Sequence, residues 1–115
     1  MSVQWLVATV AGTVVAIRLR DVQEIIDSMG VTLLPGLPAA IPGVLDWRNR
    51  AIPLIDLGAV CGERPRHDRR NAVIATAGSH ILALLIDSID GIHDGEEIGD
   101  DIRHIDPGAV LEALA

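Results

Sequence analysis

Few side chains in this sequence have the types and spacing that catalysis requires. Ser79 and His80 are adjacent, and a serine with a nearby histidine is the core of an activated nucleophile. Gly78 and Ser79 stand between two apolar runs, however, and there they predict a hairpin turn in which serine is common. The P-loop, G-x-S-x-G, C-x-x-C and H-E-x-x-H motifs are absent. We therefore expect no catalytic residue and interpret the protein as a non-enzyme.

Metal binding is the other chemistry that the residue types suggest. The spacing of the histidines matches no helical or loop pattern of zinc ligands. Residues 90–101 have the acidity of a calcium loop, but Ile92 stands where a third-position ligand is needed. We expect neither a metal nor a cofactor, and a small hydrolase or metal-binding enzyme is kept as the alternative from another class. The four histidines are His67, His80, His93 and His104.

One stretch, residues 34–57, has a pattern suited to recognition. Its three early prolines exclude helix and predict an extended connector. Residues 44–47 and 51–55 then read as two apolar strands around a polar turn, Arg48-Asn49-Arg50, in which Asn49 tolerates positive φ. Pro53 indicates an edge or a bulge, and Asp56 is a candidate helix cap. The predicted unit is a hairpin that presents arginines at its tip, a form suited to contact with a partner.

The same stretch resembles the CheW-like family of chemotaxis coupling proteins. Residues 43–57, GVLDWRNRAIPLIDL, are similar to the family pattern G-V-x-N-L-R-G-x-x-I-P-x-x-D-L. Residues 22–25 (VQEI) and 85–89 (LIDSI) match further segments, and the resemblance covers about residues 5–93. Where the family has N-L-R-G, this chain has D-W-R-N, with the arginine kept.

The resemblance implies a non-catalytic adaptor with two protein partners. Its receptor-binding residues would be Val22, Glu24, Gly43 and Arg48, facing the cytoplasmic tip of a chemoreceptor. Its kinase-binding residues would be Asn71, Ala72 and Val73, on an edge strand that packs against the regulatory domain of a CheA-type histidine kinase. The alternative is a shortened relative that binds one of these partners, as a competitor or a specialised scaffold.

Several of these residues also have an ordinary structural interpretation. Asp21 and Glu24 have the spacing of a capping box for a short helical turn, whose buried side would be Val22 and the isoleucines after Glu24. Small apolar side chains such as Ala72 and Val73 are equally typical of core. The arginines of residues 62–70 are most simply a solvated linker, although they could dock an acidic partner or the acidic tail of this chain.

The remaining chain predicts a mainly β fold. Strands are expected at residues 3–10, 14–19 and 31–34, and a second hairpin joins 71–77 to 80–86. The acidic tail, 87–106, includes a strand from Ser88; near its end the isoleucine spacing fits helix and strand alike, and we expect a final strand near residues 102–105. Asp106-Pro107 predicts a helix start, with a terminal helix over 107–114.

The resemblance implies that these elements form two small, intertwined SH3-like or OB-like barrels of five strands each. We expect the first subdomain at about 14–61, a linker at 62–70 and the second subdomain at about 71–106, with the pairing of strand 3–10 left open. Family members are usually longer, so the second barrel is expected to be incomplete. Its uncovered edge would then pair with another copy, as a homodimer through the second subdomain, or with the kinase.

Composition limits the partners further. The chain has 115 residues, no Phe or Tyr and a net charge of −7, and its nine basic residues are all arginine. Such an acidic chain is a poor candidate for binding nucleic acid or an anionic membrane. The single cysteine excludes a disulfide framework, and neither a membrane span nor a signal peptide is recognised. A cytoplasmic location is the expectation.

Overall fold

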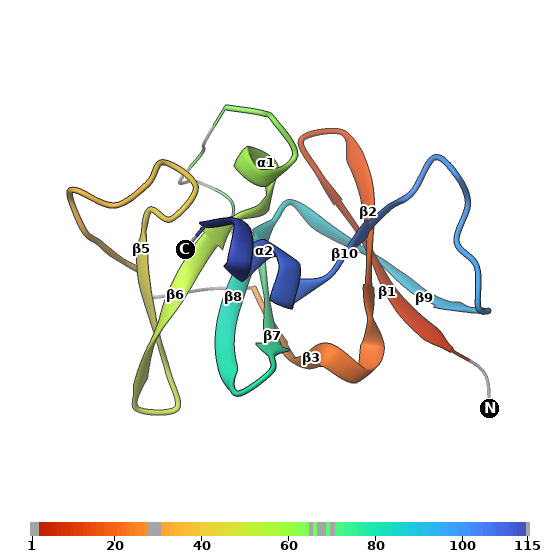
Figure 1. Ribbon diagram of the computed structural model, residues 1–115, viewed down its shortest axis with the longest axis horizontal. Coiled ribbons are helices and arrows are strands. Elements are labelled where there is room, and N and C mark those ends of the chain that lie inside the picture. The colour runs from red at the N-terminus through yellow and green to blue at the C-terminus, as the bar shows by residue number, and fades with distance from the viewer. Residues whose placement is uncertain (1–2, 28–30, 65, 67–68, 70, 115) are drawn as a thin grey trace.

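Two β-sheets and short helices form the fold in the computed structural model, which describes residues 3–27, 31–64, 66, 69 and 71–114 (Figure 1). The first sheet has four strands in the order β10-β2-β1-β9, with β10 parallel to β2 and the other neighbours antiparallel. Its strands are β1 (Gln4–Val10), β2 (Thr13–Arg18), β9 (Ser88–Asp94) and β10 (Arg103–Ile105). The predicted mainly β class is confirmed.

The second sheet has six strands in the order β3-β7-β8-β6-β5-β4. Its one parallel pair is β6 with β8. The strands are β3 (Val22–Ile26), β4 (Val31–Leu33), β5 (Gly43–Trp47), β6 (Arg50–Asp56), β7 (Asn71–Ala77) and β8 (His80–Ile86). A 3₁₀ turn, η1 (Leu19–Asp21), links β2 to β3, and two helices, α1 (Leu57–Val60) and α2 (Pro107–Leu114), complete the described residues.

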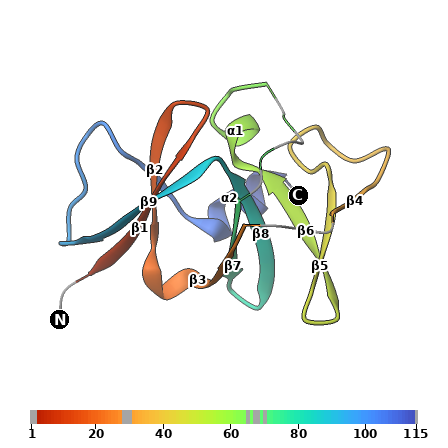
Figure 2. The ribbon, with the colours of Figure 1, turned by 180° about the vertical axis from the view of Figure 1, so that it is seen from behind.

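Each sheet takes strands from both halves of the chain. β1 pairs with β9, more than eighty positions away, and β3 pairs with β7 across the 62–70 segment. Figure 2 shows the two sheets side by side, with β7 and β8 between the four-stranded sheet and the β5–β6 hairpin. The hydrogen-bonded sheets therefore do not separate at residues 62–70, and the expected subdomain limits stay a prediction. The open question of strand 3–10 is answered, because β1 lies between β2 and β9.

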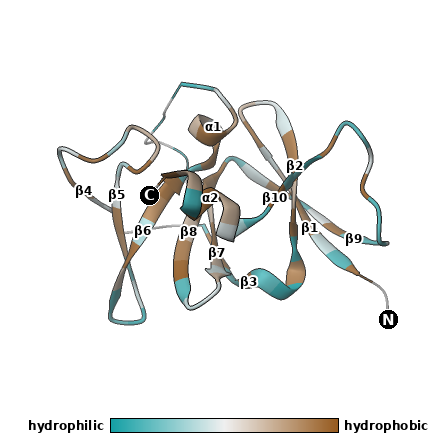
Figure 3. Cartoon of the chain, viewed as in Figure 1, coloured by the Kyte–Doolittle hydropathy of each residue, from teal (hydrophilic) through white to brown (hydrophobic). Residues whose placement is uncertain are grey.

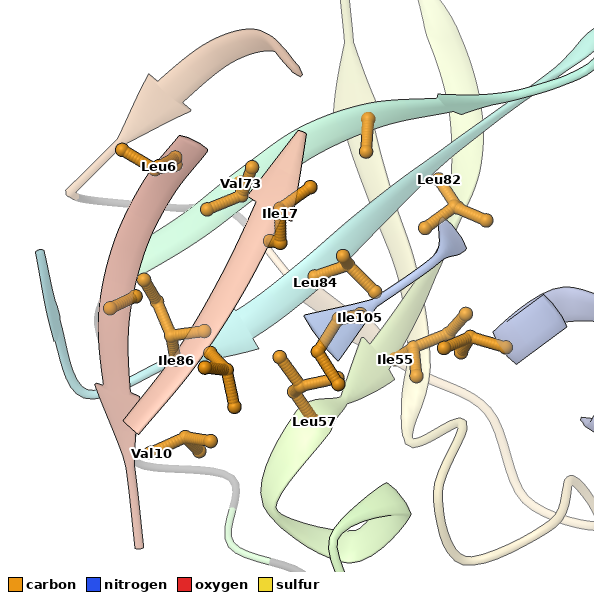
Figure 4. Close-up of a cluster of buried hydrophobic side chains, with 14 of the residues drawn as sticks. Leu6, Val10, Ile17, Ile55, Leu57, Val73, Leu82, Leu84, Ile86 and Ile105 are labelled. Atoms are coloured by element: carbon orange, nitrogen blue, oxygen red, sulfur yellow. The ribbon is translucent and has the colours of Figure 1, made fainter. Parts of the chain in front are cut away.

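The core is aliphatic and lies on both faces of β7 and β8. Alternate residues of these strands face two clusters, since side chains of a strand point to opposite sides. Leu82, Leu84 and Ile86 belong to the larger cluster between the sheets (Figure 4), while Ala83 and Leu85 belong to the smaller one within the six-stranded sheet. This double burial explains why the second hairpin is apolar at almost every position.

Several local predictions are confirmed at the residue level. Pro53 pairs with Val44 of β5, but the contact of β6 with β8 begins only at Leu54, so the proline lies where β6 has a neighbour on one side. The Asp56 side chain accepts a hydrogen bond from the Gly58 N–H at 2.9 Å and caps α1. Asp106 does the same for Gly108 at 3.0 Å and starts α2.

The capping box predicted for Asp21 and Glu24 is wrong. Asp21 ends the 3₁₀ turn, and Glu24 lies in β3, which forms a ladder with β7. Ile25, expected on the buried side of a helical turn, is 43% exposed, and Val22 and Ile26 are partly buried. A three-residue spacing cannot by itself distinguish a helix start from a strand, and here pairing with the apolar β7 decides the outcome.

The prediction that residues 62–70 form a solvated linker is also wrong for one residue, Arg69. Arg69 has only 1% of its side chain exposed, and it pairs with Asp56 at 3.2 Å and with Asp87 at 2.5 Å. Asp87 in turn accepts a hydrogen bond from the Ala11 N–H at 2.8 Å, in the β1–β2 turn. Arg69 therefore connects the end of β6 to the four-stranded sheet. Arg64 and Arg66 are exposed, as expected, and Arg70 lies outside the described residues.

The described chain after residue 70 forms four strands, β7 to β10, as the sequence predicted. The described residues form ten strands, in sheets of six and four, and β3 is the strand that was not predicted. The tail contributes two of them, β9 and β10, which settles the ambiguous isoleucine spacing in favour of strand near Ile105. No helix in the described residues is long and apolar enough to cross a membrane.

Candidate binding site at the β5–β6 hairpin

The tip of the β5–β6 hairpin is a two-residue turn with an unusual backbone. Arg48 and Asn49 both have positive φ, 49° and 62°, and Trp47 pairs directly with Arg50. Two consecutive positive φ values are the mark of a type I′ turn, which matches the twist of the flanking strands. Asparagine tolerates this region well, but an arginine there costs about 1 kcal/mol. The strained residue is the arginine that the motif retains.

Three side chains from this tip and from β3 meet on the surface. The Trp47 Nε1–H donates a hydrogen bond of 2.6 Å to Glu24 Oε2. The Arg48 guanidinium lies over the Trp47 ring, 4.6 Å from its centroid, and its Nη2 is 3.9 Å from the same Glu24 oxygen. We call these residues, Glu24, Trp47 and Arg48, the tip cluster. The structure thus brings together two of the predicted receptor-binding residues through a third that the prediction did not include.

Exposure differs sharply within the tip cluster. Trp47 is 8% exposed and packs in the smaller core cluster, while the side chains of Arg48 and Glu24 are 68% and 41% exposed. The ion pair is therefore solvated and long, and it stabilises the fold by less than about 1 kcal/mol. The stacked guanidinium keeps most of its N–H donors in solvent. Figure 3 shows this tip as hydrophilic at the end of two more apolar strands.

Val22 and Gly43 lie apart from the tip cluster. Val22 is two residues before Glu24 on β3, but a register shift separates them, and Val22 is partly buried against the larger core cluster. Gly43 lies at the opposite end of β5, roughly 13 Å along the strand from Trp47. A Cβ at residue 43 would stand 2.0 Å from the Thr32 carbonyl oxygen. The glycine is therefore required by the close approach of β4.

The predicted kinase-binding residues do not lie on an edge strand. β7 is flanked by β3 and β8, so its backbone is paired on both sides. Ala72 and Val73 are fully buried, in the smaller and the larger core cluster respectively. Asn71 is half-buried, and its Nδ2 donates to the Asp87 carbonyl oxygen at 2.6 Å. The edge position was wrong because apolar residues with small side chains are equally typical of an interior strand.

The residues weighed for catalysis or metal binding are scattered. Ser79 and His80 are exposed at the β7–β8 turn. Among the described residues, no group of three or more His, Cys, Asp or Glu side chains is placed to hold a metal ion. His104 packs against an aromatic ring instead: its imidazole contacts Trp5 edge to face, with 4.8 Å between the ring centroids. His67 lies outside the described residues.

Cys61, just after α1, should be a poor nucleophile. Burial raises the pKa of its thiol, and the nearby Arg103 guanidinium offsets part of that rise. Because the thiolate is the reactive form, we expect iodoacetamide to alkylate Cys61 more slowly than free cysteine at mildly alkaline pH. Arg103→Ala should slow the reaction further, since it removes a charge that favours the thiolate. Mass spectrometry of timed samples measures both rates, and labelling as fast as free cysteine would contradict the expectation.

Sequence reasoning missed two residues that organise these features. Trp47 was seen as part of an apolar strand, yet it stands where the family pattern has leucine, which has no N–H to donate. That difference was the available signal. Arg69 had no such signal, because its arginine-rich neighbourhood looks like any solvated linker, and only the fold brings Asp56 and Asp87 to it.

Taken together, the two sheets and the tip cluster define a small β domain, in whose described residues no group of three or more side chains is placed to hold a metal ion. The sequence matches the CheW-like domain family over residues 4–109, and the chain belongs to that family. Membership of this family, whose members are non-catalytic, confirms the expectation of a non-enzyme.

Two relatives illustrate the similarity. The chain is 30% identical over 78 residues to a probable chemotaxis protein CheW of Rhizobium etli, a match covering 66% of this chain and 50% of the relative. It therefore spans about half the length of that curated relative. The crystal structure of the scaffolding protein TtCheW from Thermoanaerobacter tengcongensis superposes with a TM-score of 0.85 at 20% identity, covering 97% of this chain and 94% of that one. The second match shows a shared fold.

Proposed function

We propose that this chain is a cytoplasmic adaptor of chemotaxis-type signal transduction, which couples the cytoplasmic tip of a chemoreceptor to the regulatory domain of a CheA-type histidine kinase. Family membership and the relatives named for chemotaxis and scaffolding support the class. The observation that carries the receptor side is the tip cluster. An arginine held in a strained turn, stacked on a tryptophan and still 68% exposed is pre-organised for a partner.

The mechanism of such an adaptor is linkage. If the tip cluster binds one receptor state more tightly than the other, that difference in binding free energy biases the kinase held elsewhere on the same domain. No bond is made or broken in this chain. The proposal places no kinase contact on the side chains of Ala72 and Val73, because they are buried, and of the three predicted residues Asn71 alone has exposed atoms.

The homodimer through the second subdomain stays a separate prediction. That prediction rested on the lack of a fifth strand after residue 70, and the described residues there form the four expected strands, β7 to β10.

Arg48→Ala should separate function from stability. The substitution removes a cation–π contact and a solvated ion pair, which together contribute about 1 kcal/mol, so the melting temperature should fall by only a few degrees. Receptor-dependent activation of the kinase, measured with reconstituted receptor, kinase and adaptor, should fall at least tenfold if the guanidinium contributes a charge-assisted contact. Arg64→Ala, at another exposed arginine, is the matched control and should activate like the parent.

Separate binding measurements distinguish the two forms of the proposal. Calorimetric titration with a receptor tip fragment and with the isolated kinase regulatory domain shows whether the chain binds both partners or one. Binding of only one partner would favour a competitor or specialised scaffold over a coupling protein. Normal activation by the folded Arg48→Ala variant would remove the tip cluster from the receptor site.

A further inference from the structure

The tip cluster depends on an indole that the family pattern does not have. The Trp47 ring is the only group in the described contacts that touches both charged members of the cluster: its N–H bonds Glu24, and its face supports the Arg48 guanidinium. The direct contact between Glu24 and Arg48 is long, 3.9 Å. Orientation of the two charges therefore comes mainly from the tryptophan.

The positions of the backbone explain why an anchor is needed. Glu24 lies on β3 and Arg48 on the β5–β6 turn, and three strands stand between β3 and β5 in the sheet order. No ladder connects the turn directly to β3. The Trp47 ring, buried at 8% exposure in the smaller core cluster, connects the hairpin to β3 through its hydrogen bond to Glu24.

We propose that Trp47 is a positioning residue of the receptor-binding site, which orients Glu24 through its N–H and Arg48 through its ring face. The proposal rests on the proposed function, because it assigns Glu24 and Arg48 to the receptor. A charge-assisted hydrogen bond to a carboxylate is short and strong, and the 2.6 Å contact fixes one rotamer of Glu24. Loss of the indole N–H leaves that carboxylate free to move toward Arg48 or solvent. Receptor binding must then fix the carboxylate in one position, and the entropy lost in doing so lowers the affinity.

The geometry can first be tested without a partner. Trp5 and Trp47 are the two tryptophans of the chain, so Trp5→Phe leaves Trp47 as the single fluorophore. In that background, Glu24→Gln and Arg48→Ala should each change the emission spectrum of Trp47, because each alters a group in direct contact with the ring. Arg64→Ala should leave the spectrum unchanged. An emission spectrum that neither Glu24→Gln nor Arg48→Ala alters would overturn the contacts on which the proposal stands.

The functional test is a double-mutant cycle with a receptor tip fragment as the probe. Trp47→Phe keeps a ring face for Arg48 but removes the N–H, and we expect it to weaken binding about tenfold, as does Glu24→Ala. Because the two residues act through one contact, their losses should not multiply. The affinity of the double variant should lie within about twofold of that of each single variant. A merely structural tryptophan would instead give independent losses that multiply. Trp5→Phe is the matched control and should bind like the parent.

The outcomes separate the two levels of the proposal. If the parent does not bind the tip fragment, the proposed receptor function fails. If the parent binds and Trp47→Phe binds equally well, or the losses multiply, the receptor function stands and the role of Trp47 is overturned. Should Trp47→Phe fail to fold, Glu24 decides the matter. Glu24→Gln still accepts the indole N–H and should retain more affinity than Glu24→Leu; equal losses would contradict the inference.

Discussion

Asp56→Ala should be among the most destabilising substitutions in this chain, by roughly 3–5 kcal/mol. Asp56 is fully buried and accepts hydrogen bonds from the Gly58 N–H, the Arg66 N–H at 2.6 Å and Arg69 Nε. Alanine would leave the guanidinium of Arg69 buried with Asp87 as its remaining described ion-pair partner. One of its nitrogens, Nη2, already has no hydrogen-bond partner in the described structure. A buried charge that loses one of its two carboxylate partners is costly, because Asp87 alone compensates it incompletely.

Thermal unfolding followed by circular dichroism gives the measurement. A loss of this size lowers the melting temperature by on the order of 12–20 °C in a domain near one hundred residues. The matched control is Asp21→Ala, which removes the partner of Arg20 in an exposed pair at 3.9 Å and should cost less than about 1 kcal/mol. Equal melting temperatures for the two variants would mean that the buried ion pair of Asp56 and Arg69 stabilises the fold no more than the pair of Asp21 and Arg20.

A double variant distinguishes loss of the ion pair from burial of the remaining charge on Arg69. Asp56→Ala/Arg69→Met removes both buried charges, and an apolar side chain of similar length fills the space of the guanidinium. The double variant should be more stable than Asp56→Ala alone, because the buried guanidinium that lost one of its partners is gone. If the double variant were less stable than the single one, packing of the arginine stem would matter more than its charge.

The β5–β6 hairpin shows how far the sequence could predict this fold. Its strands, polar turn and helix cap follow from local chemistry, since proline, asparagine and aspartate each have a restricted set of backbone or hydrogen-bonding roles. The same local rules failed for Glu24, because a capping-box spacing and a strand are compatible with the same four residues. What decided that case was pairing with β7, about fifty positions away.

Contacts of long sequence separation set the limit for the candidate site as well. Arg48 and Glu24 could be assigned from the motif, but their meeting through Trp47 depends on how the six-stranded sheet brings β3 toward the hairpin tip. The edge position expected for Asn71, Ala72 and Val73 failed for the same reason, since the sequence of a strand does not tell how many neighbours it has. Arg69 is the clearest example: its two carboxylates come from β6 and from the β8–β9 junction.

Gly43→Ala should destabilise the domain by about 2 kcal/mol, although alanine is ordinarily favoured over glycine within a strand. The added Cβ would lie 2.0 Å from the Thr32 carbonyl oxygen and 3.0 Å from Leu33 Cα, and backbone atoms cannot rotate away as a flexible side chain can. β4 is an edge strand paired only with β5, so relief requires β4 to detach. We expect faster amide hydrogen exchange in residues 31–33 and a melting temperature lower by several degrees.

Gly108→Ala is the control, because its Cβ would meet only the Asp106 carboxylate at 3.4 Å in a helix that favours alanine, and it should be neutral or stabilising. If receptor binding falls in Gly43→Ala, exchange in β4 should rise with it. Lost binding with β4 still protected would show that detachment of β4 is not the cause of the loss.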